Sequence, residues 1–329
     1  MQAKRTMLAV VALVALVALA GCTANTGDAS PTPGGNATAC AFPTTVTDAT
    51  GTSVTLDEQP ERVVALQPSD AQVMWEIGAQ SQVVGMPVGP TTGYLSGSDN
   101  RTDIKNDDGT VNVEQVVGLE PDLVLAANVT RQSTIEQLRS ADVPVYNYGL
   151  TTSVEDIIDN TQLTGQLVGE CRAANETATE FSQQVQQVED AVADSERPDA
   201  LYYFYNFTTG PGTHIHSVLE AAGVDNVAAE YNITGYAQLN EEVVAEANPD
   251  WIIYPAGSPP PERAPWSDTT AVQQGQTIEL NNNYISQPGP RVFDALRTIA
   301  DRVHPDAFDD ESAAITGPAA AVQPAAPSA

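Results

Sequence analysis

Short apolar runs alternate with segments of helical periodicity along most of the chain. Arg62–Leu66, Val83–Gly85 and Val143–Tyr146 are brief, valine-rich runs of the kind that form buried strands. Segments such as Ser69–Ile77 space their apolar residues three or four apart and stop at a glycine, as helices do. Strands that alternate with helices predict an α/β fold with parallel sheets.

The same alternation extends through both halves of the chain. Val46–Leu56 alternates polar and apolar residues around Thr50-Gly51 and predicts a β-hairpin, whereas the turn-rich stretch Met86–Asp108 predicts a long surface loop. The other predicted elements are a helix at Thr134–Ser140, strands at Ala200–Tyr205 and Thr277–Leu280, and helices at His214–Ala222 and Pro290–Val303.

Two stretches of the chain are versions of one another. Asn112–Leu125 (NVEQVVGLEPDLVL) aligns without gaps with Asn240–Ile253 (NEEVVAEANPDWII), at an offset of 128 residues. Each predicts a short helix capped by asparagine and stopped at proline, followed by a buried strand. The repeat predicts two lobes built alike, with Glu114 and Glu242 at matching places in the first turn of equivalent helices.

A long helical region separates the two copies. Ser153–Ser195 contains no proline, keeps helical spacing and opens with Ser153 and Asp156 in the pattern of a capping box. The region predicts either one long helix or two helices with a break near Gly169. A stiff helical connection predicts lobes that move little against each other.

The expected fold is α/β, with two Rossmann-like lobes joined by a long rigid helix and a ligand cleft between the lobes. The expected boundaries, in chain order, are a lipoprotein signal at 1–22, a flexible tether at 23–43, an N-terminal lobe at 44–152, the linking helix at 153–195, a C-terminal lobe at 196–304 and a disordered tail at 305–329.

The first residues predict export from the cell. Lys4 and Arg5 precede the apolar core Met7–Ala20, and Leu19-Ala20-Gly21-Cys22 matches the lipobox, whose cysteine is lipidated. The apolar core is shorter than the roughly 20 residues that span a bilayer. We expect a lipid on Cys22 to hold the body at the extracellular face of the cell membrane. An uncleaved anchor helix is the alternative.

The charge of the chain excludes some classes of partner. The sequence has 43 acidic and 13 basic residues, for a formal net charge of -30, and its only lysines are Lys4 and Lys105. A field of this sign repels nucleic acid and anionic membrane surfaces. The regular apolar segments argue against a disordered acidic protein. Abundant carboxylates with almost no lysine indicate an extreme halophile, because molar salt screens the self-repulsion.

The cysteines predict a disulfide, and the absence of catalytic motifs argues against an enzyme. With Cys22 assigned to lipid, Cys40 and Cys171 are expected to form a disulfide in an exported protein, and two free thiols are the alternative. The sequence has no GxxxxGK[ST], no GxGxxG after a strand and no GxSxG. His214 and His216 lie two residues apart with no third ligand nearby. We therefore expect no enzyme activity, no cofactor and no metal site.

The motifs resemble those of a known family. PERVVALQPSDAQVMWEIGA, the first repeat copy, the helical region, QLNEEVVAEANPDWII and PGPRVFDALR resemble the substrate-binding proteins of ABC importers for cobalamin and iron chelates. The resemblance covers roughly residues 44–304. It implies two α/β lobes joined by one long helix, a small-molecule ligand in the cleft, and delivery of that ligand to permease and ATPase subunits.

The resemblance implies roles for the two matching glutamates. In that family, one glutamate on the tip of each lobe docks onto arginines of the permease, and Glu114 and Glu242 fall on these positions. A carboxylate in the first turn of a helix is also favoured by the helix dipole, by about 0.3–1 kcal/mol. The alternative is that both glutamates serve only their own helices.

The resemblance also implies a set of ligand contacts. Tyr236 matches an aromatic pocket position of cobalamin binders, and Asn283 and Tyr284 match an aspartate and a tryptophan. An aromatic residue expected shortly before Glu114 is absent. The full set of candidate ligand contacts is Tyr94, Phe204, Tyr236, Asn283 and Tyr284.

The candidate contacts are neutral, which favours a corrinoid as the transported ligand. A ferric siderophore or haem, which would prefer basic groups in the cleft, is the alternative within the family. An exported enzyme or an adhesion module is the alternative from another class. An enzyme would need a catalytic constellation, and an adhesion module would not need paired glutamates.

Overall fold

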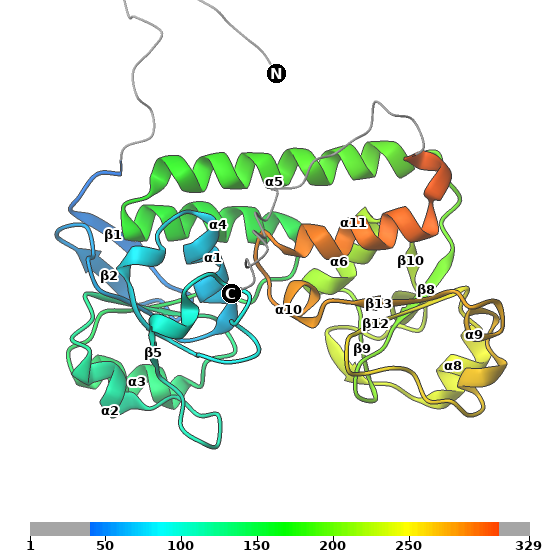
Figure 1. Ribbon diagram of the computed structural model, residues 1–329, viewed down its shortest axis with the longest axis horizontal. Helices are drawn as coiled ribbons and strands as arrows, with labels where there is room; N and C mark the ends of the chain where they lie inside the picture. The colour runs from blue at the N-terminus through cyan, green and yellow to red at the C-terminus, as the bar shows by residue number, and fades with distance from the viewer. Residues whose placement is uncertain (1–39, 309–329) are drawn as a thin grey trace, which may run out of the picture. The chain divides into compact units, whose positions relative to one another are not determined.

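A five-stranded parallel sheet forms the centre of the first lobe (Figure 1) in the computed structural model, which describes residues 40–308. The strands are β3 (Val63–Ala65), β4 (Val83–Met86), β5 (Thr102–Asp103), β6 (Leu123–Ala126) and β7 (Val145–Asn147), in the spatial order β5-β4-β3-β6-β7. The chain starts at the central strand, builds outward to β5, and returns to the other side of β3 with β6. The loops after β3 and β6 therefore diverge and open a crevice at the carboxyl ends of the strands.

Helices and a hairpin complete the first lobe. α1 (Pro68–Glu76), α2 (Val113–Gly118) and α3 (Gln132–Ser140) are its α-helices, and 3-10 turns lie at Gln80–Gln82 and Ser98–Asn100. The predicted hairpin is confirmed as β1 (Thr44–Thr47) and β2 (Ser53–Leu56), which pair antiparallel.

The second lobe repeats the plan with a four-stranded parallel sheet. Its strands are β8 (Asp199–Tyr202), β10 (Asp225–Asn226), β12 (Trp251–Pro255) and β13 (Thr277–Leu280), in the order β10-β8-β12-β13. The switch point lies between β8 and β12. A second, antiparallel pair is formed by β9 (Phe207–Thr209) and β11 (Tyr236–Gln238). Sequence periodicity did not predict this pair.

The second lobe is richer in short helices. They are α6 (His214–Ala221), α7 (Val227–Glu230), α8 (Glu241–Ala247), α9 (Thr270–Gln274), α10 (Asn282–Ile285) and α11 (Val292–Val303), with 3-10 turns at Trp266–Asp268 and Pro305–Ala307. α11 presents a strongly apolar face to the core, where Phe293, Leu296 and Ile299 are buried.

The internal repeat is confirmed as a repeated structural unit. α2 with β6 and α8 with β12 are the two copies, and each strand lies beside the first strand of its own sheet. The asparagine caps hold as predicted, since Asn112 accepts from the backbone N–H of Gln115 and Asn240 accepts from that of Glu242.

The aspartate of each Pro-Asp pair has a structural role that the sequence did not reveal. The Asp122 carboxylate accepts the backbone N–H groups of Glu61 and Arg62 at 2.9 and 2.8 Å, just before β3. The Asp250 carboxylate accepts that of Asp199 at 3.3 Å, at the start of β8. Each repeat copy therefore aligns its strand with the neighbouring first strand.

The helical region forms two helices rather than one. α4 (Val154–Val168) ends at Gly169, which has a left-handed φ of 81°, and α5 (Cys171–Val192) turns back alongside it (Figure 1). The predicted capping box of Ser153 and Asp156 is present. The break near Gly169 is therefore the correct alternative, and the single long helix is wrong.

Both helices connect the two lobes. α4 buries Val154 and Ile157 in the second-lobe core and Leu167 and Val168 in the first. α5 does the reverse, with Ala174 in the first-lobe core and Phe181 through Val192 in the second. The disulfide between Cys40 and Cys171 is present and ties the start of the body to the start of α5.

Two local expectations need correction. Met86–Asp108 is not a plain surface loop, because it contributes β5 and buries Leu95 and Ile104 completely in the lobe. α1 begins at Pro68 rather than after a Ser69 cap, and the Asp70 side chain accepts the backbone N–H of Gln67. Phe42 packs against the first-lobe core and Phe308 against the second, and the domain limits at 44 and 304 stay predictions.

The predicted signal, Cys22, most of the tether and the tail after 308 lie outside the described residues. Within residues 40–308, no helix is both long enough and apolar enough to span a membrane.

The close approach of α4 and α5 gives a testable prediction. A Cβ on Gly165 would lie 2.1 Å from the Cβ of Ala174, so Gly165→Ala forces the two helices apart. Overpacking of this kind costs about 1–3 kcal/mol. Gly118→Ala, at the end of α2 with nothing within 4 Å, is the matched control and should be neutral or stabilising. Urea unfolding at constant salt measures both, and equal midpoints for the two variants would contradict the prediction.

Candidate functional site

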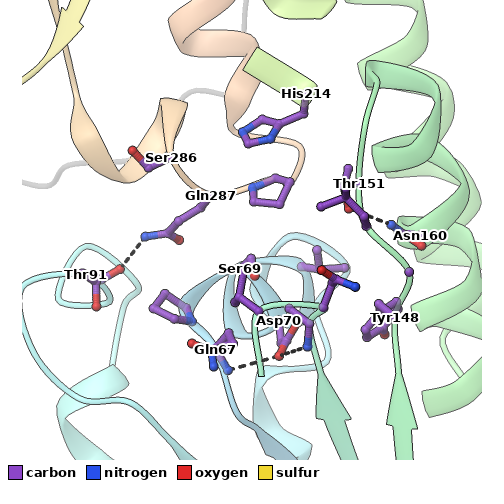
Figure 2. Close-up of a pocket in the computed structure, with 18 of the residues that line it drawn as sticks. Gln67, Ser69, Asp70, Thr91, Tyr148, Thr151, Asn160, His214, Ser286 and Gln287 are labelled. Carbon is purple, nitrogen blue, oxygen red and sulfur yellow. Dashed lines mark hydrogen bonds between the residues drawn. The ribbon is translucent and has the colours of Figure 1, made fainter. Parts of the chain in front are cut away.

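A cavity of about 330 Å³ lies between the lobes, at the carboxyl ends of both sheets. The first lobe contributes the loops after β3, β6 and β7, and the second lobe contributes α6, β11 and the segment after β13. Figure 2 shows Ser69 and Asp70 on one side of this cavity and His214 and Gln287 across from them. The loops at the switch point of the first sheet, after β3 and β6, therefore face the second lobe across one space, as expected for ligand sites in open α/β sheets.

Asp70 is the carboxylate of the first-lobe wall. Its Oδ2 accepts the backbone N–H groups of Gln67 and Ala127, both at 3.1 Å, so the side chain links the loops after β3 and β6. The residue is only 6% exposed, and burial raises its pKa to about 7. Asp70 is thus fixed in position at the cavity with a carboxyl group that titrates near neutrality.

The rest of the first-lobe wall is largely apolar. The buried Tyr148 hydroxyl and Thr164 hydroxyl share a hydrogen bond of 2.7 Å, and burial raises the pKa of Tyr148 well above its usual range. Val129 and Leu150 follow β6 and β7, and their side chains stay 74% and 53% exposed. Large aliphatic groups this exposed are typical of a surface that a ligand covers.

His214 anchors the second-lobe wall. It is the first residue of α6, and its Nε2 lies 2.9 Å from the carbonyl oxygen of Ile285. Burial lowers its pKa to about 4, so the ring is neutral at physiological pH. In the neutral ring Nε2 donates to Ile285, which leaves Nδ1 as an acceptor.

Exposed hydrophobic side chains concentrate around the cavity. Among residues 40–308, the large hydrophobic side chains that remain exposed are Val129, Leu150, Tyr205, Phe207 and Tyr236. Val129, Leu150 and Tyr236 line the cavity. Phe207 and Tyr205 lie on β9 and the turn before it, next to β11, which carries Tyr236. The mouth of the cleft is therefore an apolar, partly aromatic surface.

Positive charge is absent from the described lining of the cavity, which contains no lysine and no arginine. Its acid–base groups are Asp70, His214, Tyr148 and Tyr236. Within residues 40–308 there is also no cluster of three or more histidine, cysteine, aspartate or glutamate side chains able to hold a metal ion. The arrangement suits a ligand that is large, weakly charged and held mainly by apolar contact.

The candidate ligand contacts fall into two groups. Tyr236 and Asn283 line the cavity, and Phe204 packs edge-to-face behind Tyr236 with ring centroids 6.2 Å apart. Tyr94 and Tyr284 do not line it, because they pack edge-to-face on each other at 5.9 Å where the lobes touch. The ligand-binding role of all five stays a prediction.

Tyr94 lies in the contact between the two lobes. Its hydroxyl donates to Gln287 at 2.8 Å and accepts from Gln72 at 2.9 Å. Glu76 of α1 pairs with Arg291 at 2.5 Å, and Asn283 donates to the carbonyl of Pro90 at 3.0 Å. These bonds hold α1 and the 86–108 segment against the loop before α11.

Gln287 and His214 are site residues that sequence reasoning missed or set aside. Gln287 is buried and donates to the carbonyl of Thr91 at 2.8 Å, also across the lobes (Figure 2). A lone glutamine before a proline carries no periodic signal. The sequence gives His214 no partner, and its hydrogen bond to the Ile285 carbonyl on α10 fixes it in the wall of the cavity.

Glu114 and Glu242 are both exposed, on α2 and α8. In Figure 1 these helices both lie at the edge of the body opposite α5. The neighbouring Glu241 is paired with Arg263 at 2.6 Å, whereas the Glu242 carboxylate contacts Asn240 at 3.3 Å. Glu242 thus presents its charge to solvent while Glu241 is used within the lobe.

The buried histidine gives a pH-dependent prediction. Because folding lowers the pKa of His214 from 6.5 to about 4, the unfolded chain takes up a proton between these values and the folded chain does not. Stability should therefore fall with pH from 6.5 towards 4, by at most about 1.4 kcal/mol per unit. His214→Gln can still donate to Ile285 and should lack this loss.

The measurement is urea unfolding of both proteins from pH 4 to 8. The prediction concerns the difference between them, because Asp70, whose pKa is raised, affects both curves with the opposite sign over part of the range. Parallel curves for the two proteins would contradict it.

Known proteins share this sequence pattern. Residues 63–284 match the family described as periplasmic binding protein. The chain is 40% identical over 280 residues to the cobalamin-binding protein of Halobacterium salinarum, which covers 81% of this chain and 75% of that protein. It is 26% identical over 282 residues to an uncharacterized ABC transporter substrate-binding lipoprotein of Bacillus subtilis, covering 82% and 88%.

Solved structures share the fold. The heme binding protein HmuT matches with a TM-score of 0.68 at 21% identity, over 80% of this chain and 91% of that one. The periplasmic vitamin B12 binding protein of Vibrio cholerae matches with a TM-score of 0.65 at 21% identity, over 76% and 98%. With the family match spanning both sheets and most of the residues that line the cavity between them, the chain belongs to the periplasmic binding protein family.

Proposed function

We propose that this protein is the substrate-binding component of an ABC importer and that it captures a corrinoid such as cobalamin. The relative from Halobacterium salinarum, at 40% identity over most of the chain, supports the corrinoid as ligand. The transported corrinoid is cargo and not a cofactor of the protein.

The observation that carries this proposal is the character of the cavity. Its described lining has no cationic side chain, and its mouth gathers the exposed apolar and aromatic groups of the described residues. A corrin ring with carboxamide side chains offers a broad apolar face and a polar, neutral rim. Haem propionates and most ferric siderophores are anionic and would leave their charges unpaired here.

Delivery to the membrane is proposed to use Glu114 and Glu242. Two exposed carboxylates on equivalent helices can meet basic groups of a permease, one from each lobe. We also propose that a lipid on Cys22 holds the protein at the extracellular face of the cell membrane, in high external salt. The sequence motif and the net charge of -30 support these two points.

Spectral titration tests the ligand. Cyanocobalamin should bind with a Kd of micromolar or below, seen as a change in its visible absorption in high-salt buffer. Tyr236→Ala should weaken binding by about tenfold, because one aromatic contact is worth roughly 0.5–1.5 kcal/mol beyond its buried area. Tyr236→Phe keeps the ring and should bind nearly as well as wild type. Absence of corrinoid binding, with binding of haem or a siderophore instead, would contradict the proposed ligand.

Uptake assays test the two glutamates. Glu114→Gln with Glu242→Gln should abolish uptake of labelled cobalamin into cells while leaving the Kd of the isolated protein unchanged. The matched control is Glu120→Gln with Glu246→Gln, two exposed carboxylates beside the same helices that should leave uptake intact. Reduced affinity in the first double variant, or normal uptake, would sink the docking assignment.

A further inference from the structure

The amino end of α1 forms part of the cavity wall, through Gln67, Pro68, Ser69 and Asp70 (Figure 2). The first turn of a helix carries partial positive charge and unpaired N–H groups, and so it ordinarily attracts an anion. Here Asp70, at the third helical position, brings a carboxylate of its own to that place. An anionic ligand group would therefore meet a negative charge rather than an open helix end.

The Asp70 carboxylate has one oxygen left for a ligand. Both backbone bonds, from Gln67 and Ala127, go to Oδ2. Among residues 40–308, no protein group donates a hydrogen bond to Oδ1. Asp70 is only 6% exposed, and it lines the cavity. Oδ1 is not one of the fully buried side-chain atoms without a partner, so it is accessible from the cavity, where a ligand donor can reach it.

The surroundings of Asp70 make it a hydrogen-bond acceptor rather than half of an ion pair. Lys105 is the cation that acts on it, but Lys105 is not part of the cavity lining. Across the cavity, the neutral His214 ring uses Nε2 on Ile285 and offers only an acceptor at Nδ1. At these two residues the wall of the cavity therefore presents hydrogen-bond acceptors, which can pair with donors on a ligand.

We propose that Asp70 is the residue that selects amide-bearing ligands, by accepting an amide N–H on Oδ1 and repelling any ligand that presents a carboxylate there. This inference rests on the proposed function and names the part of the corrinoid that is recognised. Corrinoids whose side chains are carboxamides fit this site, and corrinoids whose side chains are free carboxylates do not.

Two effects contribute to this selectivity: a hydrogen bond from an amide to Asp70, and repulsion of a ligand carboxylate by Asp70. A hydrogen bond to a charged group contributes enough that its loss weakens binding by about 10- to 100-fold. Placing a carboxylate of the ligand against Asp70 is unfavourable by a larger factor, because like charges meet in a dry site. Together they predict a preference for amide over carboxylate of at least about 100-fold.

The test compares two corrinoids on the intact exported body. The probes are dicyanocobinamide, which carries carboxamides, and dicyanocobyrinic acid, which has carboxylates in their place. Both are titrated at pH 8, above the value near 7 to which burial raises the pKa of Asp70, so that the side chain is ionised. The wild-type protein should prefer cobinamide by at least about 100-fold.

Variants then assign the preference to one residue. Asp70→Asn keeps the shape and removes the charge, so the preference should shrink by about tenfold or more, with cobyrinic acid binding more tightly than to wild type. Asp294→Asn removes one carboxylate from an exposed position on α11 outside the cavity and should leave the preference unchanged. Circular dichroism and the unfolding midpoint verify that each variant folds.

Each outcome decides the matter. A wild-type protein that binds both corrinoids equally overturns the inference without any variant, and so does an unchanged preference in a folded Asp70→Asn. In both cases corrinoid binding survives, so the proposed function stands. A wild-type protein that binds cyanocobalamin but neither probe overturns the inference alone. One that binds neither probe nor cyanocobalamin overturns the proposed function, and the inference fails with it.

Discussion

The packing of α4 against α5 is the constraint on which the rest of the structure depends. Each helix buries one end in the core of the first lobe and the other end in the core of the second, in opposite order. Gly165 lets the pair approach closely, and the 40–171 disulfide pins the turn between them. Because the two cores share these helices, one lobe cannot shift without disturbing apolar contacts in both.

That constraint brings the switch point of the first sheet, between β3 and β6, to face α6, β11 and the segment after β13 of the second lobe. Held together, the two lobes form a cavity whose walls come from eight separate segments. Hydrogen bonds and an ion pair at Gln72, Gln287 and Arg291 join the two lobes beside the cavity. These contacts fix much of the lining in position without a ligand.

The cavity lining carries little charge, whereas the chain as a whole is strongly negative. The formal charge of the chain is -30, yet among residues 40–308 the lining of the cavity has a single carboxyl group, that of Asp70. Surface carboxylates are hydrated and screened by salt, whereas a buried one must be used or neutralised. Asp70 therefore differs from the other acidic residues of the chain, because its carboxyl group is buried at the cavity and theirs are mostly hydrated at the surface.

The sequence by itself determined the local elements and the twofold plan. Apolar periodicity and caps identified most strands and helices, the hairpin and both copies of the repeat, because these signals act over a few residues. Only the tertiary structure decided what contacts what. Tyr94 and Tyr236 have similar aromatic side chains in loop-rich sequence, yet one closes the contact between lobes and the other lines the cavity. His214, Gln287 and the aspartates of the repeats likewise gain their roles from partners 51 to 215 residues away, since hydrogen bonds and burial depend on distance in space and not along the chain.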